Sequence, residues 1–178
     1  MAKAKKPAKK PSTKENKPGK RLYTLEVSLI GGPVEEAFAE DNPVVSRTIQ
    51  ARGDQTLADL HKAIFDAFDR FDEHMYEFQF GKKPMDNQGP RYSVSSPYEG
   101  DEGAKPAEGA ALDSLDLKVG RTFFYWFDFG DDWMHQIKVE GIEGAPAGGK
   151  YPKVTKRVGK SPPQYPDSED EDFDEDED

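Results

Sequence analysis

The stretch TFFYWFDFGDDWMHQIKVE, residues 122–140, decides the fold. Two runs rich in apolar residues, 122–129 and 133–140, flank the letters GDD. Such runs are typical of strands, and glycine and aspartate are typical of the turn between two strands. The stretch therefore predicts a β-hairpin, which we expect to be the strongest strand pair of the chain.

A three-residue loop at 130–132 places Phe129 opposite Trp133. One face of the hairpin is then almost wholly apolar and consists of Phe123, Tyr125, Phe127, Trp133, His135, Ile137 and Val139. A two-residue loop would instead mix Asp128 with Trp133. Because register is normally fixed by the sorting of apolar from polar side chains, we predict the three-residue loop, with His135 opposite Phe127.

The hairpin also carries the side chains that are the best candidates for metal binding or acid–base chemistry. We expect His135 to be a histidine at the edge of the core, and Asp131 and Asp132 to form the turn. The alternative is a divalent metal site or a general acid–base pair, with His61 or His74 brought in by the fold. Its candidate ligands are His74, Asp128, Asp132 and His135, a set that suits zinc, manganese or iron(II). No HxH or HExxH spacing supports it, so we predict no cofactor and no catalytic residue.

The elements before the hairpin follow from local patterns. We predict strands at 22–30 and 44–51, then a helix from an N-cap at Thr56 to about Asp72, then a strand at 75–80. Residues 86–111 are predicted to form a long loop with one short extended piece near RYSV, and 112–119 a short strand or turn. Beyond Gly141 the chain is rich in Gly, Pro and Lys, which we do not expect inside a sheet.

This order of elements predicts a single α+β domain. Its sheet is expected to be mixed or antiparallel, with one main helix packed on one face and a β-grasp-like N-terminal portion.

The chain of 178 residues has a formal net charge of −10, and its two ends carry opposite charges. Residues 1–21 hold eight lysines and one arginine against one glutamate, and 167–178 hold ten carboxylates. We predict a basic disordered tail at 1–21, the domain at 22–166 and an acidic disordered tail at 167–178. Nucleic acid is a possible partner of the basic tail through Lys3, Lys5, Lys6, Lys9 and Lys10.

The chain has no cysteine, which excludes disulfides and thiolate chemistry and favours a cytoplasmic location. No run of about 18 apolar residues occurs, so we predict no membrane partner.

Four segments resemble, in this order, the Ri-plasmid open-reading-frame-3-like family (plasmid pRiA4b ORF-3-like): TLADLHKAIFDAF, HMYEFQF, YWFDFGDDWMHQIKVE and YPKVTKRVGKSPPQY. The resemblance spans roughly residues 22–166. It implies a compact α+β domain without established catalytic activity, associated with plasmids and mobile elements; some members carry a resolvase-like label as passengers of insertion sequences. The positions that recur in the family correspond here to Leu60, His61, His74, Phe78, Asp128, Gly130, Asp131, Asp132, Trp133 and His135.

Three functions remain open from the sequence. The first is a non-enzymatic binding module for an unknown protein or peptide, with a recognition surface made by the hairpin tip and the nearby long loop. Its candidate residues are Asp128, Asp131, Asp132, Trp133 and His135. The second is a metal-assisted hydrolase or nuclease that uses Asp128, Asp132 and His135. The third is a nucleic-acid accessory protein that binds through its basic arm.

Overall fold

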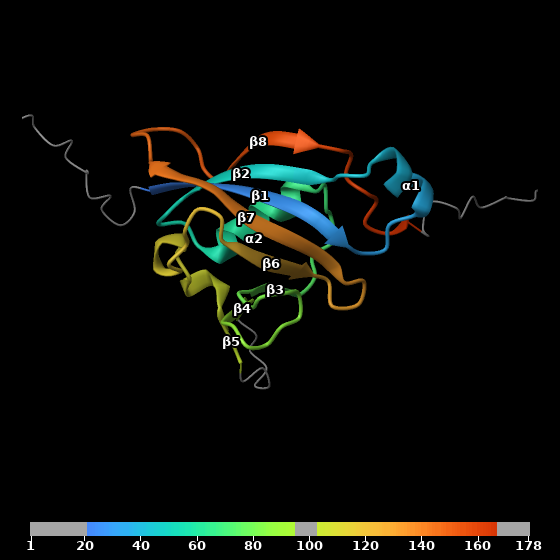
Figure 1. The fold of residues 1–178 in the computed structure, drawn as a ribbon, viewed down its shortest axis with the longest axis horizontal. Coiled ribbons are helices and arrows are strands. Elements are labelled where there is room, and N and C mark those ends of the chain that lie inside the picture. The colour runs from blue at the N-terminus through green and yellow to red at the C-terminus, as the bar shows by residue number, and fades with distance from the viewer. Residues whose placement is uncertain (1–20, 95–102, 167–178) are drawn as a thin grey trace, which may run out of the picture.

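A computed structural model describes residues 21–94 and 103–166. Its eight strands form one sheet in the order β5-β4-β3-β6-β7-β1-β2-β8 (Figure 1). Only β4 and β5 pair in parallel; the other neighbouring strands are antiparallel. The α+β class with a mixed sheet is therefore confirmed.

In chain order the elements are β1 (Arg21–Gly31), α1 (Glu36–Asp41), β2 (Ser46–Arg52), α2 (Leu57–Ala67), β3 (Tyr76–Gln79), β4 (Arg91–Ser93), β5 (Ala104–Pro106), the 3-10 helices η1 (Ala107–Gly109) and η2 (Leu112–Ser114), β6 (Thr122–Phe127), β7 (Trp133–Gly144) and β8 (Lys153–Val158). Among residues 21–94 and 103–166, no helix combines the length and the apolar character that crossing a membrane requires.

The core lies between the sheet and α2, which is seen behind β1 and β7 in Figure 1. Alternate residues of each central strand point toward it, as the period of two requires. The helix contributes five buried side chains, Leu57, Leu60, His61, Ile64 and Ala67. Within the described residues, no helix covers the opposite face of the central strands, which faces the viewer in Figure 1 and which we call the open face.

Helix α2 begins as the sequence predicts. The backbone N–H of Asp59 donates to Thr56 Oγ1 at 3.2 Å, and the N–H of Thr56 donates to Asp59 Oδ2 at 2.9 Å. This reciprocal capping box satisfies two of the N–H groups that a helix start leaves unpaired.

The end of α2 was predicted too late. The helix stops at Ala67, not near Asp72, because Asp69 adopts a left-handed backbone with φ of 55°. The carbonyl of Ala67 accepts instead from the side chains of Arg47 and Arg157, at 2.9 and 2.6 Å. Phe71, which the helical pattern places in the core, is consequently 73% exposed.

The predicted hairpin forms, but its register differs from the prediction by two residues. Phe127 pairs with Trp133, so the loop has five residues, 128–132, and His135 lies opposite Tyr125 rather than Phe127. A shift of two preserves which side chains share a face, so all seven residues of the predicted apolar face are buried.

The longer loop has a physical cause in its aspartates. Asp128 and Asp132 both take left-handed backbones, with φ of 63° and 56°. The N–H of Asp132 donates to the carbonyl of Asp128 at 2.7 Å, which closes the loop. Aspartate tolerates this conformation better than most residues, which explains its place at both ends of the loop.

The sequence did not predict α1, β5, the 3-10 helices or β8. Strand β8 is largely exposed along its length, so it lacks the alternation that marks a half-buried strand. It pairs with β2 at the edge of the sheet, which agrees with the expectation that the region after Gly141 stays out of the interior. The extended piece near RYSV is β4. Arg21 belongs to β1, whereas the predicted basic arm and acidic tail lie otherwise outside the described residues.

Candidate functional site

Asp128 joins the hairpin loop to the segment that follows α2. Its side chain is buried, and Oδ1 accepts the N–H groups of Gly130 and Asp131 at 2.9 and 3.2 Å. Its own N–H donates to the carbonyl of Met75 at 2.9 Å. The remaining carboxylate oxygen, Oδ2, lies 3.5 Å from Nε2 of His74. Asp128 thus shapes the loop with one oxygen and faces a histidine with the other.

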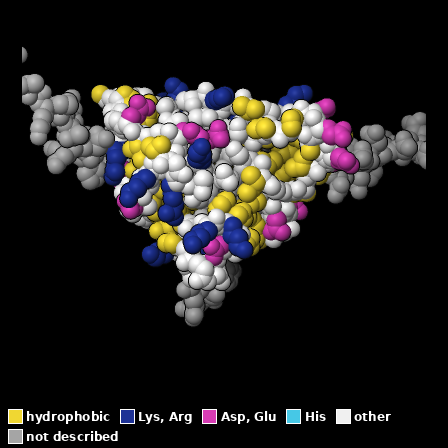
Figure 2. Space-filling view, in the orientation of Figure 1, with side chains coloured by type: hydrophobic (Ala, Val, Ile, Leu, Met, Phe, Trp, Pro, Cys, Tyr) yellow, Lys and Arg dark blue, Asp and Glu magenta, His cyan; other side chains and the backbone are white. Residues whose placement is uncertain are grey.

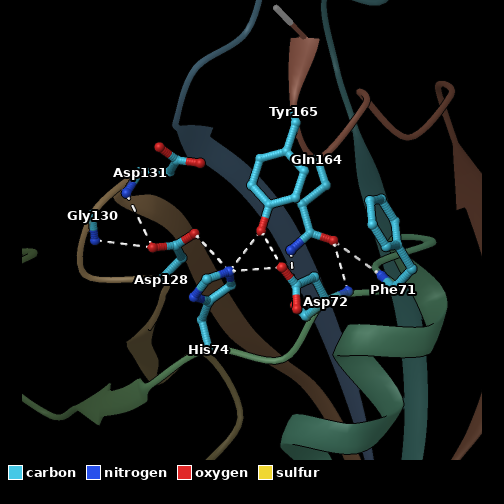
Figure 3. Close-up of polar contacts among 8 residues, drawn as sticks. All are labelled: Phe71, Asp72, His74, Asp128, Gly130, Asp131, Gln164 and Tyr165. Atoms are coloured by element: carbon cyan, nitrogen blue, oxygen red, sulfur yellow. Dashed lines mark hydrogen bonds and ion pairs between the residues drawn. The ribbon is translucent and has the colours of Figure 1, made fainter. Parts of the chain in front are cut away.

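His74 is the centre of a polar group that we call the His74 cluster, made of Asp72, His74, Asp128 and Tyr165 (Figure 3). Nε2 of His74 lies 2.7 Å from the hydroxyl of Tyr165 and 3.5 Å from Oδ2 of Asp72. The Tyr165 hydroxyl donates to Asp72 Oδ2 at 2.6 Å. This bond raises the pKa of Tyr165 to about 12.

These contacts fix which nitrogen of His74 carries the proton. Since the hydroxyl proton of Tyr165 is given to Asp72, the tyrosine oxygen accepts from Nε2–H of His74. Nδ1 of His74 makes no hydrogen bond to another residue within 21–94 and 103–166. The partly exposed ring is therefore oriented by one nitrogen, and the other could accept a hydrogen bond from a ligand.

The C-terminal segment is bound into the cluster by a buried glutamine. Gln164 Oε1 accepts the N–H groups of Phe71 and Asp72, at 3.0 and 3.2 Å, and its Nε2 donates to the carbonyl of Asp72 at 2.8 Å. This clamp positions Tyr165 beside His74. Sequence reasoning missed Asp72, Gln164 and Tyr165, although the letters QY end one of the four segments that resemble the family.

The predicted metal set is not brought together. Of its four residues, His74 and Asp128 are in contact, whereas Asp132 accepts the indole N–H of Trp126 at 2.9 Å and His135 lies in the core. Within the described part of the chain, no group of three or more histidine, aspartate or glutamate side chains is placed to hold a metal ion.

His135 is a core residue. Its ring packs edge-to-face on Phe68, with centroids 4.9 Å apart, and Nδ1–H donates to the carbonyl of Tyr125 at 3.2 Å. Complete burial lowers the pKa of His135 to about 3, so the ring is neutral near pH 7.

Trp133 is fully buried as well. The guanidinium of Arg70 stacks on its ring at 3.9 Å from the centroid. Gly32, with φ of 145°, approaches so closely that a Cβ there would lie 2.4 Å from the indole. Trp133 and His135 therefore do not lie on the surface, and their inclusion in a recognition surface was wrong. Strand alternation had already placed both on the apolar face.

His61 also has a structural role, because it packs and forms polar contacts within the core. It stacks on Tyr76 with centroids 3.7 Å apart, and its two nitrogens lie 2.7 Å from the Tyr125 hydroxyl and 3.2 Å from Glu73. Burial is the main cause that lowers its pKa. The histidine thus links α2 to β3 and β6 within the core.

The part of the hairpin that reaches solvent is its tip, which we define as half-buried Trp126 and Asp131 together with exposed Phe129 and Asp132. The rings of Trp126 and Phe129 stack at 4.0 Å, and Phe129 is 40% exposed. Asp132 anchors the indole through its N–H, whereas the Asp131 carboxylate has no hydrogen bond or ion pair to another described residue. The sequence pointed to the two aspartates but not to the stacked pair, which depends on the five-residue loop.

Comparison with known proteins places the chain among uncharacterised relatives. It is 27% identical over 122 residues to the uncharacterised protein y4hQ of Sinorhizobium fredii (strain NBRC 101917 / NGR234). The match covers 68% of this chain and 59% of that relative, so the chain spans less than two thirds of its length.

The fold is similar to the crystal structure of a protein of unknown function, MM3350, from Methanosarcina mazei Go1. The TM-score is 0.60 at 25% identity, and the match covers 78% of this chain and 70% of that one. The family model of the plasmid pRiA4b ORF-3-like proteins matches residues 35–169, which is more than half of the chain. The chain therefore belongs to the plasmid pRiA4b ORF-3-like family.

Proposed function

We propose that this domain is a non-enzymatic binding module and that the hairpin tip recognises a basic segment of a protein or peptide. The observation that carries the proposal is the stacked pair of Trp126 and Phe129 beside two carboxylates, those of half-buried Asp131 and exposed Asp132. Aromatic side chains held on a loop and partly open to solvent are typical anchors of protein recognition.

The chemistry of the tip favours a cationic partner. The face of an aromatic ring attracts a guanidinium or an ammonium group, and the Asp131 carboxylate has no competing partner among the described residues. Figure 2 shows hydrophobic side chains in a broken band across the open face, over the ends of β1, β7 and β6, with acidic side chains at its margin. An arginine- or lysine-rich segment that also carries apolar side chains fits such a surface.

The proposal is tested by fluorescence anisotropy with a short labelled peptide of arginine, lysine and glycine. Phe129→Ala should raise its Kd by about tenfold, because a desolvated cation–π contact is worth up to about 2 kcal/mol. Val119→Ala is the matched control, since Val119 is an exposed apolar residue outside the tip. Equal affinity of the two variants, or equal binding of a peptide with glutamate in place of the basic residues, would contradict the proposal.

The nucleic-acid hypothesis stays a prediction, because Lys3, Lys5, Lys6, Lys9 and Lys10 lie outside the described residues. The cytoplasmic location and the absence of a membrane partner also stay predictions. For the fold, we propose that the N-terminal portion is β-grasp-like with α2 as its main helix. The antiparallel pair β1–β2 followed by α2 supports this. The arrangement departs from a β-grasp in one respect, because β3 pairs with β6 and not with β1.

A further inference from the structure

A cavity of about 620 Å³ lies beside the C-terminal end of α2, and none of the four tip residues lines it. Segments from β2, the residues after α2, β8 and the C-terminal segment line it. Its volume falls in the range of roughly 300–1,000 Å³ that is usual for small-molecule sites.

The charged residues that line the cavity are mostly cationic. Arg47, Arg157 and Lys160 line it, against a single carboxylate, that of Asp69. Asp69 is already engaged, because its Oδ2 accepts the hydroxyl proton of Ser161 at 2.6 Å. In a chain with a net charge of −10, this is a local excess of positive charge.

The cations retain donors after their structural contacts are made. Arg47 is buried and gives Nε–H to Ala67 and one Nη2–H to Ser161, at 2.9 Å each, which leaves the second Nη2–H. Arg157 uses Nη1 on the same Ala67 carbonyl. Within residues 21–94 and 103–166, neither Nη2 of Arg157 nor Nζ of Lys160 has a partner. Both arginines thus cap α2 and still present N–H groups to a ligand.

Repulsion between Arg47 and Arg157, which Asp69 offsets in part, favours an anion near them. Burial lowers the pKa of Arg47, and the neighbouring charge of Arg157 lowers it further. An anionic ligand would offset both effects, since an opposite charge stabilises the protonated form.

The cavity lining also includes two aromatic residues, Phe71 and Tyr165. The ring of Phe71 is largely exposed and packs edge-to-face on Tyr165, with centroids 5.8 Å apart and an interplanar angle of 81°. Gln164 holds the backbone of Phe71 in place. A fixed, exposed ring in a cavity offers a surface on which a planar group can stack.

We propose that this cavity binds a phosphate ester that carries a planar ring, as in a nucleoside phosphate. Arg47, Arg157 and Lys160 hold the phosphate, and Phe71 stacks on the ring. The ester comes either from a free nucleotide or from a nucleotide within single-stranded nucleic acid.

Calorimetric titration of the full chain with AMP, adenosine and inorganic phosphate tests this site. AMP should bind more tightly than either of its parts. Lys160→Gln should weaken AMP binding by roughly fivefold and reduce its dependence on salt. Phe71→Ala should weaken AMP binding by roughly fivefold or more while leaving phosphate binding unchanged. Both side chains are exposed, so both variants should fold, and their unfolding midpoints verify this.

Lys156→Gln is the matched control, because Lys156 is an exposed lysine of β8 that does not line the cavity. A single-stranded oligonucleotide distinguishes the two sources. If it binds and its binding requires Phe71 and Lys160, the ligand is nucleic acid. If AMP binds in this way and the oligonucleotide does not, the ligand is the free nucleotide. The proposal is overturned if AMP does not bind at millimolar concentration. It is also overturned if folded Lys160→Gln and Phe71→Ala bind AMP as Lys156→Gln does.

Discussion

His135 and His74 lie in opposite environments. His135 is enclosed by the core, and burial lowers its pKa to about 3. His74 is partly exposed, faces Asp72, Asp128 and Tyr165, and keeps one nitrogen without a described partner. The histidine inside FDFGDDWMH is therefore structural, whereas an aspartate of the same motif orients a histidine from another segment. The role of each histidine thus depends on where it lies: His135 on the buried face of β7, His74 in the partly exposed segment before β3.

The two tryptophans extend the comparison between core and surface. Trp133→Ala should lower the free energy of unfolding by about 3 kcal/mol, because it removes a large buried aromatic. Trp126→Ala, on the open face, should cost less than half as much. Urea unfolding of both variants measures this, and equal losses would contradict the assignment of Trp133 to the core and of Trp126 to the open face.

Asp128 connects the hairpin loop to His74, so its removal should have the next largest effect on the free energy of unfolding. Asp128→Ala leaves the N–H groups of Gly130 and Asp131 without their acceptor and should cost about 2 kcal/mol in urea unfolding. Asp128→Asn keeps one acceptor oxygen and should cost less. A loss below about 0.5 kcal/mol for the alanine variant would show that the loop does not depend on this carboxylate.

Acid should reveal the contribution of His135 to stability. The pKa of His135 is lower in the folded state than its ordinary value of 6.5, so the unfolded chain takes up the proton first as the pH falls. Its contribution to stability is complete above pH 6.5 and is lost between pH 6.5 and about 3, at a slope of at most about 1.4 kcal/mol per pH unit.

The measurement is urea unfolding at a series of pH values for the wild type, His135→Gln and His74→Gln. His135→Gln should flatten the profile in this window, whereas His74→Gln should keep the contribution of His135. An unchanged slope in His135→Gln would contradict the assignment of a buried neutral ring.

Asp131 should show the smallest effect on stability. Asp131→Ala should change the free energy of unfolding by less than about 1 kcal/mol, because its carboxylate makes no described contact. The same variant should nevertheless weaken the binding of the basic peptide in the anisotropy assay. A folded Asp131→Ala that binds the peptide as the wild type does would remove Asp131 from the recognition surface.

Local patterns predicted those parts of the fold that depend on few residues. The capping box of Thr56 and the faces of β6 and β7 follow from spacing alone, since side chains alternate whatever the loop length. The register does not follow from spacing, because it depends on left-handed backbones at Asp128 and Asp132. The end of α2 was missed for a similar reason: Arg47 and Arg157, remote in sequence, take over the last helical carbonyl.

The His74 cluster shows why the site was only half predictable. Asp128 stood out because it lies in a dense motif, whereas Tyr165 reaches His74 only through the contacts of Gln164 with the residues after α2. No periodicity relates these segments, which lie more than 90 residues apart. Phe129 was likewise assigned to a strand and became an exposed loop residue once the register moved.

The chain has two tryptophans, and their indole N–H signals are separately visible in a proton–nitrogen NMR spectrum. Titration with the basic peptide should shift the signal of Trp126, whose indole is bonded to Asp132 at the hairpin tip, and leave that of buried Trp133 in place. We expect this pattern if the hairpin tip binds the peptide while the apolar face of the hairpin stays in the core. A shift of Trp133 without Trp126, or no shift of either at saturating peptide, would contradict it.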